Sequence, residues 1–177
     1  MKNIALLKKK TLRQIAEFIC ISARTAPKAK GIDNILTYII DNDKEKTRLI
    51  SRMREIAKKE NKPGFSRDAD NINQAPVLVL IGTKTEPIGL TYCGFCGYPD
   101  CAALKKAKGI CAYNTIDLGI AVGSAVSKAA DFRVDNRLMY SAGKAAIELN
   151  FFKDKKVKIA LGIPLSATGK NPFFDRK

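Results

Sequence analysis

Four of the five cysteines lie close together in the second half of the chain, and their spacing is the clearest chemical signal in the sequence. They follow the pattern C-x2-C-x4-C-x9-C and are Cys93, Cys96, Cys101 and Cys111. Two sulfurs two residues apart reach one centre only where the backbone wraps around it. Gly94 and Gly97 each follow a cysteine and permit that wrapping, because glycine accepts backbone angles that other residues avoid. The pattern predicts a metal centre.

Three kinds of chemistry fit these thiols. An iron–sulfur cluster is favoured, because four thiolates hold a [4Fe–4S] core, and the nearby Lys105, Lys106 and Lys108 would soften its negative charge. Structural zinc is the alternative, although zinc ribbons usually pair two C-x2-C knuckles and this chain has one. Redox-active thiols are the third interpretation. Disulfides are not expected, because a chain of this length can bury its own core in a reducing compartment.

Two further residues, Asp100 and Cys20, receive ordinary structural interpretations. Asp100 stands between loop and helix, where a carboxylate suits an N-cap better than a metal ligand. Cys20 lies between Ile19 and Ile21 in a predicted helix and is expected to be a buried apolar side chain.

The chain contains no histidine, and this excludes several kinds of site. A Ser-His-Asp triad, a Cys-His pair, a Cys2His2 zinc finger and a Rieske centre all require one. Acid–base chemistry would fall on carboxylates, Lys, Tyr or thiols. No catalytic residue is identified from the sequence.

The formal net charge is +15, from 32 Lys and Arg against 17 Asp and Glu. The basic residues are spread along the chain, Trp is absent and no nucleic-acid-binding module is found, so nucleic acid is the weaker expectation. A positive surface would also attract an acidic redox carrier such as a ferredoxin. No apolar run approaches the roughly 20 residues that span a bilayer, and the start does not fit a signal peptide. A cytoplasmic protein without membrane contact is expected.

Periodicity predicts an α+β protein. Helices are expected from a capping box at Thr11 to about Thr25, over 43–59, from an Asn114 cap to about Asp131, and over 137–150. Strands are expected over 35–40, 76–82 and 157–163. Residues 60–75 are expected to form a polar loop that can include a helical turn. Gly119 and Gly123 stand one helical turn apart, which indicates tight helix packing, a flat ligand or contact across a two-fold axis. No linker or repeat divides residues 1–177, so a single domain is expected, with residues 89–113 as an iron–sulfur insert.

The cysteine segment resembles small four-iron cluster domains whose motif reads C-G-x-C-G-x-x-x-C before a helix, although Cys111 lies nearer than the fourth ligand of that group. In order, the other segments resemble a shortened flavin-dependent nitroreductase. These segments are Ala23–Ala29, Ala75–Val77, Ile116–Ala121 and Ala160–Pro164. The resemblance implies a central mixed sheet flanked by helices, a homodimer, and FMN.

The resemblance also has departures. Lys28 replaces a serine, Gly31 stands where a flavin-contacting asparagine is usual, and the Arg-rich motif for the flavin phosphate is missing. If FMN binds, the available phosphate partners are Arg24, Lys28, Lys170 and Arg176. The shortened core with its cysteine insert is also similar to a family of uncharacterised prokaryotic proteins described as containing a ferredoxin domain, with Ser166–Arg176 as its C-terminal signature. The expected function is iron–sulfur electron transfer, in an FMN-linked oxidoreductase or beside a partner enzyme. The alternative is a zinc-stabilised basic module that contacts nucleic acid or an acidic protein.

Overall fold

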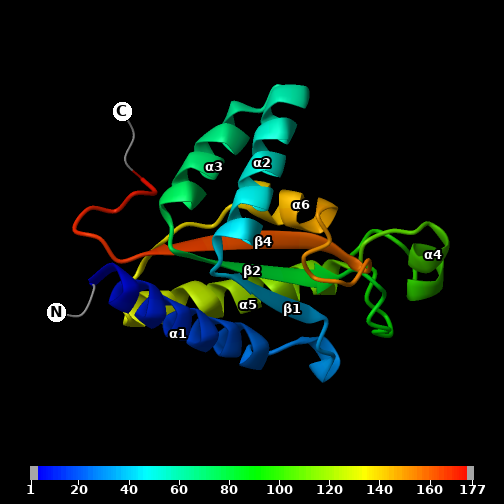
Figure 1. Ribbon diagram of the computed structural model, residues 1–177. Helices are drawn as coiled ribbons and strands as arrows, with labels where there is room; N and C mark the ends of the chain where they lie inside the picture. Colours follow the sequence, from blue (N-terminus) through cyan, green and yellow to red (C-terminus); the bar gives the residue numbers. More distant parts are fainter. Residues whose placement is uncertain (1–3, 175–177) are drawn as a thin grey trace.

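The computed structural model describes residues 4–174 and places a four-stranded sheet between two layers of helices (Figure 1). The helices are α1 (Ile4–Thr25), α2 (Asp43–Lys59), α3 (Pro63–Gln74), α4 (Cys101–Lys106), α5 (Ala112–Asp131) and α6 (Tyr140–Glu148), with a 3-10 turn η1 (Ala29–Gly31). The strands are β1 (Ile35–Ile40), β2 (Val77–Lys84), β3 (Asp135–Asn136) and β4 (Val157–Ser166). Within the described range, every helix is too short or too polar to cross a membrane.

The strand order is β1-β2-β4-β3, and all three pairings are antiparallel. The helices explain the directions, because α2 and α3 run out and back and return the chain to the end where β1 stopped. The helices α5 and α6 do the same between β2 and β4. The expected α+β class, with a central sheet flanked by helices, is confirmed. It differs in one respect: the sheet of residues 4–174 is antiparallel throughout, where strands of mixed direction were expected.

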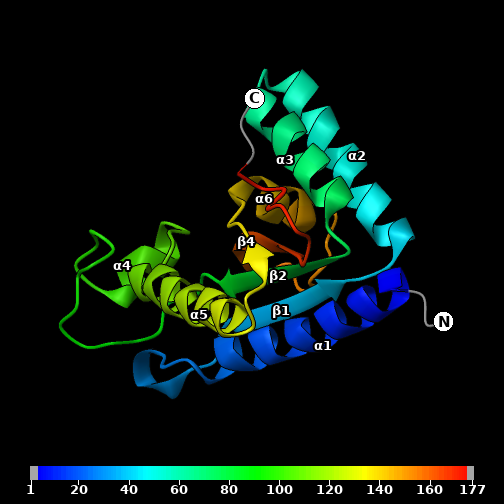
Figure 2. The ribbon, with the colours of Figure 1, turned by 90° about the vertical axis from the view of Figure 1, so that its left-hand side faces the viewer.

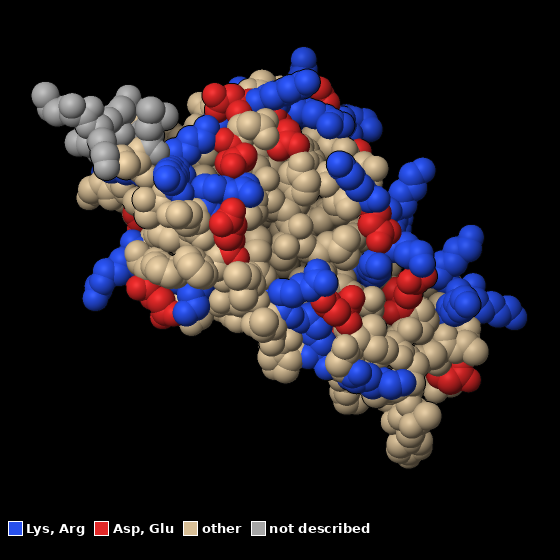
Figure 3. Space-filling view, turned by 60° about the horizontal axis from the view of Figure 1, so that its bottom comes forward, with Lys and Arg blue, Asp and Glu red and all other residues tan. Residues whose placement is uncertain are grey.

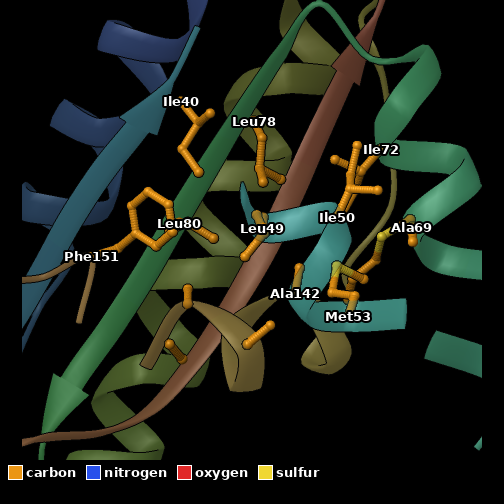
Figure 4. Close-up of a cluster of buried hydrophobic side chains, with 14 of the residues drawn as sticks. Ile40, Leu49, Ile50, Met53, Ala69, Ile72, Leu78, Leu80, Ala142 and Phe151 are labelled. Atoms are coloured by element: carbon orange, nitrogen blue, oxygen red, sulfur yellow. The ribbon is translucent and has the colours of Figure 1, made fainter. Parts of the chain in front are cut away.

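The strand β2 is buried on both faces, as its apolar run predicts (Figure 2). Val77, Val79 and Ile81 pack in the cluster formed with α1 and α5. Leu78 and Leu80 point the other way, into the cluster formed with α2, α3 and α6 (Figure 4). Side chains alternate along a strand, so β2 joins both cores.

The first helix is longer than the capping box predicts. It is already formed at Ile4, so Thr11 lies in its interior and caps nothing. The apolar stripe was predicted correctly, since its members are all buried: Leu12, Ile15, Ala16, Ile19 and Ala23. The helix ends at Thr25, before Pro27.

The expectation of a loop over 60–75 is wrong, because α3 occupies most of it. Pro63 starts the helix, where its missing N–H costs nothing. Phe65, Ala69 and Ile72 are buried at helical spacing on an otherwise polar helix. Three apolar residues are enough here because α2 covers them.

The last two elements differ from their expected bounds. The helix α6 is shorter than 137–150, because residues 135–136 pair with β4 and the backbone of Met139 exchanges two hydrogen bonds of 2.9 Å with Gly162. The strand β4 continues three residues beyond Ile163, to Ser166, alongside the start of β2.

Candidate metal centre

The cysteines lie in a lobe that projects from one end of the sheet (Figures 1 and 2). This cysteine lobe, residues 85–111, starts after β2, includes α4 and ends where α5 begins. Its own small apolar cluster consists of Ile88, Leu104 and Cys111. The lobe is therefore anchored by its own packing outside the two main cores.

The backbone of the lobe turns sharply beside the first two cysteines. Gly94 has φ +67° and Gly97 has φ +82°, angles that side chains with a Cβ rarely adopt. The Gly97 N–H donates to the Gly94 carbonyl over 2.9 Å and closes a turn around Cys96. The two glycines thus have the wrapping role that the motif predicts.

All four predicted ligands line one cavity of about 430 Å³. Cys93 and Cys96 come from the loop, Cys101 is the first residue of α4, and Cys111 is the N-cap of α5. Cys111 is buried, and its N–H donates to the Thr85 carbonyl over 3.2 Å. The other three are half-buried and open toward solvent.

The five cysteines are all free thiols. In residues 4–174 no three or more His, Cys, Asp or Glu side chains lie close enough together to hold a metal ion. The four thiols thus share a cavity without meeting at one point. Their chemistry fits a cluster, because thiolate is the ligand that iron–sulfur centres take.

Asp100 has the capping role expected of it, whereas Cys20 is partly buried where a buried side chain was expected. The Asp100 carboxylate accepts from the Ala103 N–H over 2.7 Å and caps α4. Cys20 lies on α1 and packs against the core beneath that helix. Burial raises the pKa of the Cys20 thiol, although a hydrogen bond with Thr37 opposes the shift.

Asn114 is not the helix cap that the sequence suggests. It lies inside the first turn of α5, fully buried, and its amide donates to the Glu86 carbonyl over 2.6 Å. Its carbonyl oxygen accepts from the Asn34 side chain over 2.9 Å. Asn114 therefore ties the base of the cysteine lobe to the segment that precedes β1.

Asp117 is a second tether that the sequence analysis did not identify. Its carboxylate accepts from the Ala29 N–H, with distances of 3.1 and 3.2 Å to its two oxygens. Its position in the sequence could have revealed this role, because Asn114 and Asp117 share a helix face with the buried Leu118 and Ala121. Polar residues on an apolar face are normally hydrogen-bonded.

Three of the four predicted flavin contacts lie within residues 4–174, where Arg24 and Lys28 are close together and Lys170 is apart from them. Arg24 pairs with Asp33, and Lys28 donates to the carbonyls of Arg24 and Ala26 over 2.5 and 2.8 Å, which caps α1. Lys170 follows β4 and lines a hollow with Asn71 and Gln74 of α3, at the opposite end of the sheet. Arg176 falls outside the described residues. Arg24, Lys28 and Lys170 therefore do not form one phosphate site within the described residues.

The fold is that of the nitroreductases, as the sequence resemblance implied. The structure of a nitroreductase with bound FMN from Bacteroides fragilis matches at a TM-score of 0.64, with 11% identity, over 93% of this chain and 81% of that one. A nitroreductase with bound FMN from Desulfitobacterium hafniense matches at 0.62, with 12% identity, over 89% and 78%. A BluB-like flavoprotein from Clostridium difficile matches at 0.58, with 19% identity, over 93% and 82%. At such identities the likeness shows the fold alone.

The sequence comparisons identify the family. An uncharacterised protein of Archaeoglobus fulgidus is 40% identical over 163 residues, which are 88% of this chain and 86% of that protein. Residues 107–176 match the family described as "Uncharacterized protein containing a ferredoxin domain (DUF2148)". The chain belongs to this family, as its cysteine insert and C-terminal signature suggested. The matched segment includes Cys111 and begins after Cys93, Cys96 and Cys101.

Proposed function

We propose that the chain is a one-electron redox protein that holds an iron–sulfur cluster in the cysteine lobe. The observation that carries the proposal is that four thiols from a loop and two helix starts line one cavity. Membership of a family described by its ferredoxin domain supports it. Residues 89–113 are the proposed cluster insert.

Each part of the lobe has a task in this proposal. Cys93, Cys96, Cys101 and Cys111 would hold the cluster, which when bound accepts and releases single electrons. Gly94 and Gly97 shape the loop so that its N–H groups can turn toward cluster sulfur. Ile88 and Leu104 form the apolar floor that limits water, which affects the potential of such centres.

FMN is not part of this proposal. Related folds contain it, as the structures from B. fragilis and D. hafniense show. Here Arg24 and Lys28 are engaged with Asp33 and the end of α1, and Lys170 lies at the other end of the sheet. An FMN-linked oxidoreductase would need a phosphate site, and Arg24, Lys28 and Lys170 do not form one within residues 4–174 of a single copy.

Anaerobic purification, followed by reconstitution with iron and sulfide, tests the proposal. We expect a brown protein with broad visible absorption and about four irons per chain. Acid extraction of the same preparation reports any flavin. A colourless protein that retains a single zinc ion would establish the alternative, a structural zinc module.

The ligand set is tested by exchanging single sulfurs for oxygen. Cys96→Ser is expected to abolish most of the visible absorption, because a hydroxyl is a poor substitute for thiolate at a cluster iron. The matched control is Cys20→Ser on α1, which should retain full absorption. Full colour in the Cys96 variant would remove that residue from the ligand set.

A further inference from the structure

The end of the molecule that carries the cysteine lobe is strongly basic. Two ion pairs, Lys156–Glu86 at 3.0 Å and Lys84–Asp154 at 3.3 Å, hold the turn of residues 153–158 beside the base of the lobe. Residues 84–113 and 153–158 together contain eight lysines and three acidic residues. All three acidic residues already have partners: Glu86 and Asp154 form the two ion pairs, and Asp100 caps α4. Figure 3, with this end to the right, shows Lys and Arg side chains projecting around it.

The lysines of the lobe are available for a partner. Lys105, Lys106 and Lys108 are exposed, and none of them makes an ion pair within residues 4–174. Lys105 and Lys108 border an open hollow of about 660 Å³ that Cys101 also lines. Because Cys101 lines the cysteine cavity as well, an acidic group in this hollow would lie next to a proposed cluster ligand.

Exposed aromatic and aliphatic side chains stand among these charges. Phe95, between two of the cysteines, is 67% exposed and stacks on Tyr113, with ring centres 5.6 Å apart and planes 7° from parallel. Tyr92 is fully exposed, and Ile110 is 46% exposed. Apolar side chains of this size cost solvation free energy in water, and rigid aromatic anchors are typical of protein interfaces.

We propose that the cysteine lobe is the docking surface for an acidic electron-carrier protein. This inference rests on the proposed function, because it assigns a partner to the same site. The lysines attract an acidic surface at long range, and Phe95 and Ile110 supply the apolar contact once the two proteins meet. A nucleic acid is the less suitable partner, because the aromatic pair is stacked on itself and does not present separate faces to successive bases.

The test is titration calorimetry between the reconstituted protein and a plant-type [2Fe–2S] ferredoxin, an acidic one-electron carrier. The lobe variant is Lys105→Glu, Lys106→Glu and Lys108→Glu combined. The control is Lys8→Glu, Lys9→Glu and Lys10→Glu combined, which makes the same change in net charge on α1, at the far end of the molecule (Figure 1). We expect the lobe variant to lose about tenfold or more in affinity at low salt, and the control to lose less than about threefold.

A further variant tests the apolar contact. Phe95→Ala should weaken binding without changing its dependence on salt, since no charge is altered. Equal losses in the lobe and control variants would overturn the proposal, because net charge alone would then explain binding. Tighter binding of the wild type to a duplex DNA oligonucleotide, lost in the lobe variant, would also overturn it. The visible spectrum of each variant reports the cluster separately, so failure of docking is distinguished from failure of the proposed function.

Discussion

At the scale of single residues, the five cysteines divide into two kinds that the sequence already separates. Cys20 packs on the core beneath α1, and burial raises the pKa of its thiol. The other four line a cavity at the surface. The close spacing and the flanking glycines distinguish these four cysteines from Cys20, because a cysteine that only packs on the core requires neither feature.

Alkylation with iodoacetamide measures this difference. Only the thiolate reacts, so at pH 8 Cys20 should be labelled more slowly than an ordinary thiol with a pKa near 8.5. In the metal-free protein, Cys93, Cys96 and Cys101 should be labelled before Cys20 and Cys111, because burial raises the pKa of the Cys20 thiol and Cys111 is buried. Peptide mass spectrometry after a short reaction gives the order.

Cluster assembly should then protect the thiols of the lobe. After reconstitution we expect Cys93, Cys96 and Cys101 to resist labelling, since a sulfur bound to iron is no longer a free nucleophile. Cys20 serves as the internal control, because its slow labelling should be unchanged. A Cys93 that stays reactive in the brown protein would contradict its role as a ligand.

At the scale of elements, the helix α6 and the strand β4 meet through their smallest residues. A Cβ at Gly143 would lie 1.8 Å from the Ala160 carbonyl oxygen, and a Cβ at Gly162 would lie 2.6 Å from the Ala142 Cβ. Glycine is needed at both positions because a Cβ there would overlap atoms of the facing element, which are too tightly packed to move away. This contact lets α6 lie directly against the backbone of β4.

Gly143→Ala should therefore destabilise the fold by about 3 kcal/mol, at the upper end of overpacking costs. The matched control is Gly64→Ala in α3, whose Cβ would meet only a flexible Arg67 side chain at 3.9 Å. There the lower entropy of the unfolded chain should stabilise the protein by about 0.5 kcal/mol. Urea unfolding measures both changes. Equal stability of the two variants would contradict the close contact of α6 with β4.

Elements with a strong local pattern were predicted well. The bounds of β1 and α2 are those expected, because each has a continuous or periodic apolar pattern between turn or capping residues. Asn42 caps α2 by accepting from the Glu45 N–H over 2.9 Å. The helix α3 was missed because its apolar residues are few and its stability depends on packing against α2, which local sequence does not encode.

The site was predicted in the same uneven way. The four cysteines were assigned to one site from spacing alone, and they do line one cavity. The tethers Asn114 and Asp117 were not recognised, because their partners lie 80 and 88 residues earlier. The flavin contacts came from resemblance, and Lys28 departs from that family's pattern. In the structure its charge stabilises the C-terminal end of α1.

At the scale of the whole molecule, the helices α1 and α5 present an apolar surface to solvent. Phe18 and Ile21 on α1 are 51% and 57% exposed, and Ile116 and Ile120 on α5 are 43% and 41% exposed. Between Thr115 and Ser127 the one charged residue is Asp117, which is buried. Figure 3 turns this side of the molecule toward the reader and shows stretches of uncharged surface between groups of charged side chains.

We propose that a second copy of the chain covers this surface. Two copies with a net charge of +15 each can approach only where charges are few, which favours this face over the basic lobe. Gly119 and Gly123 leave open space where a Cβ would stand, so another backbone can come close. The 20 residues of α5 span about 30 Å, which is long enough for an interface of roughly 800 Å² per partner.

Ile120→Glu tests the pairing, because a charge at the centre of an apolar two-fold contact meets its own copy. We expect the wild type to sediment with twice the mass of one chain, and the variant to sediment as a monomer with its circular dichroism unchanged. Leu138→Glu is the matched control, since Leu138 is 45% exposed and lies outside α1 and α5, and it should leave the dimer intact. A monomeric wild type would contradict the proposed pairing. A dimer that persists in Ile120→Glu would show that the two copies meet through a different surface.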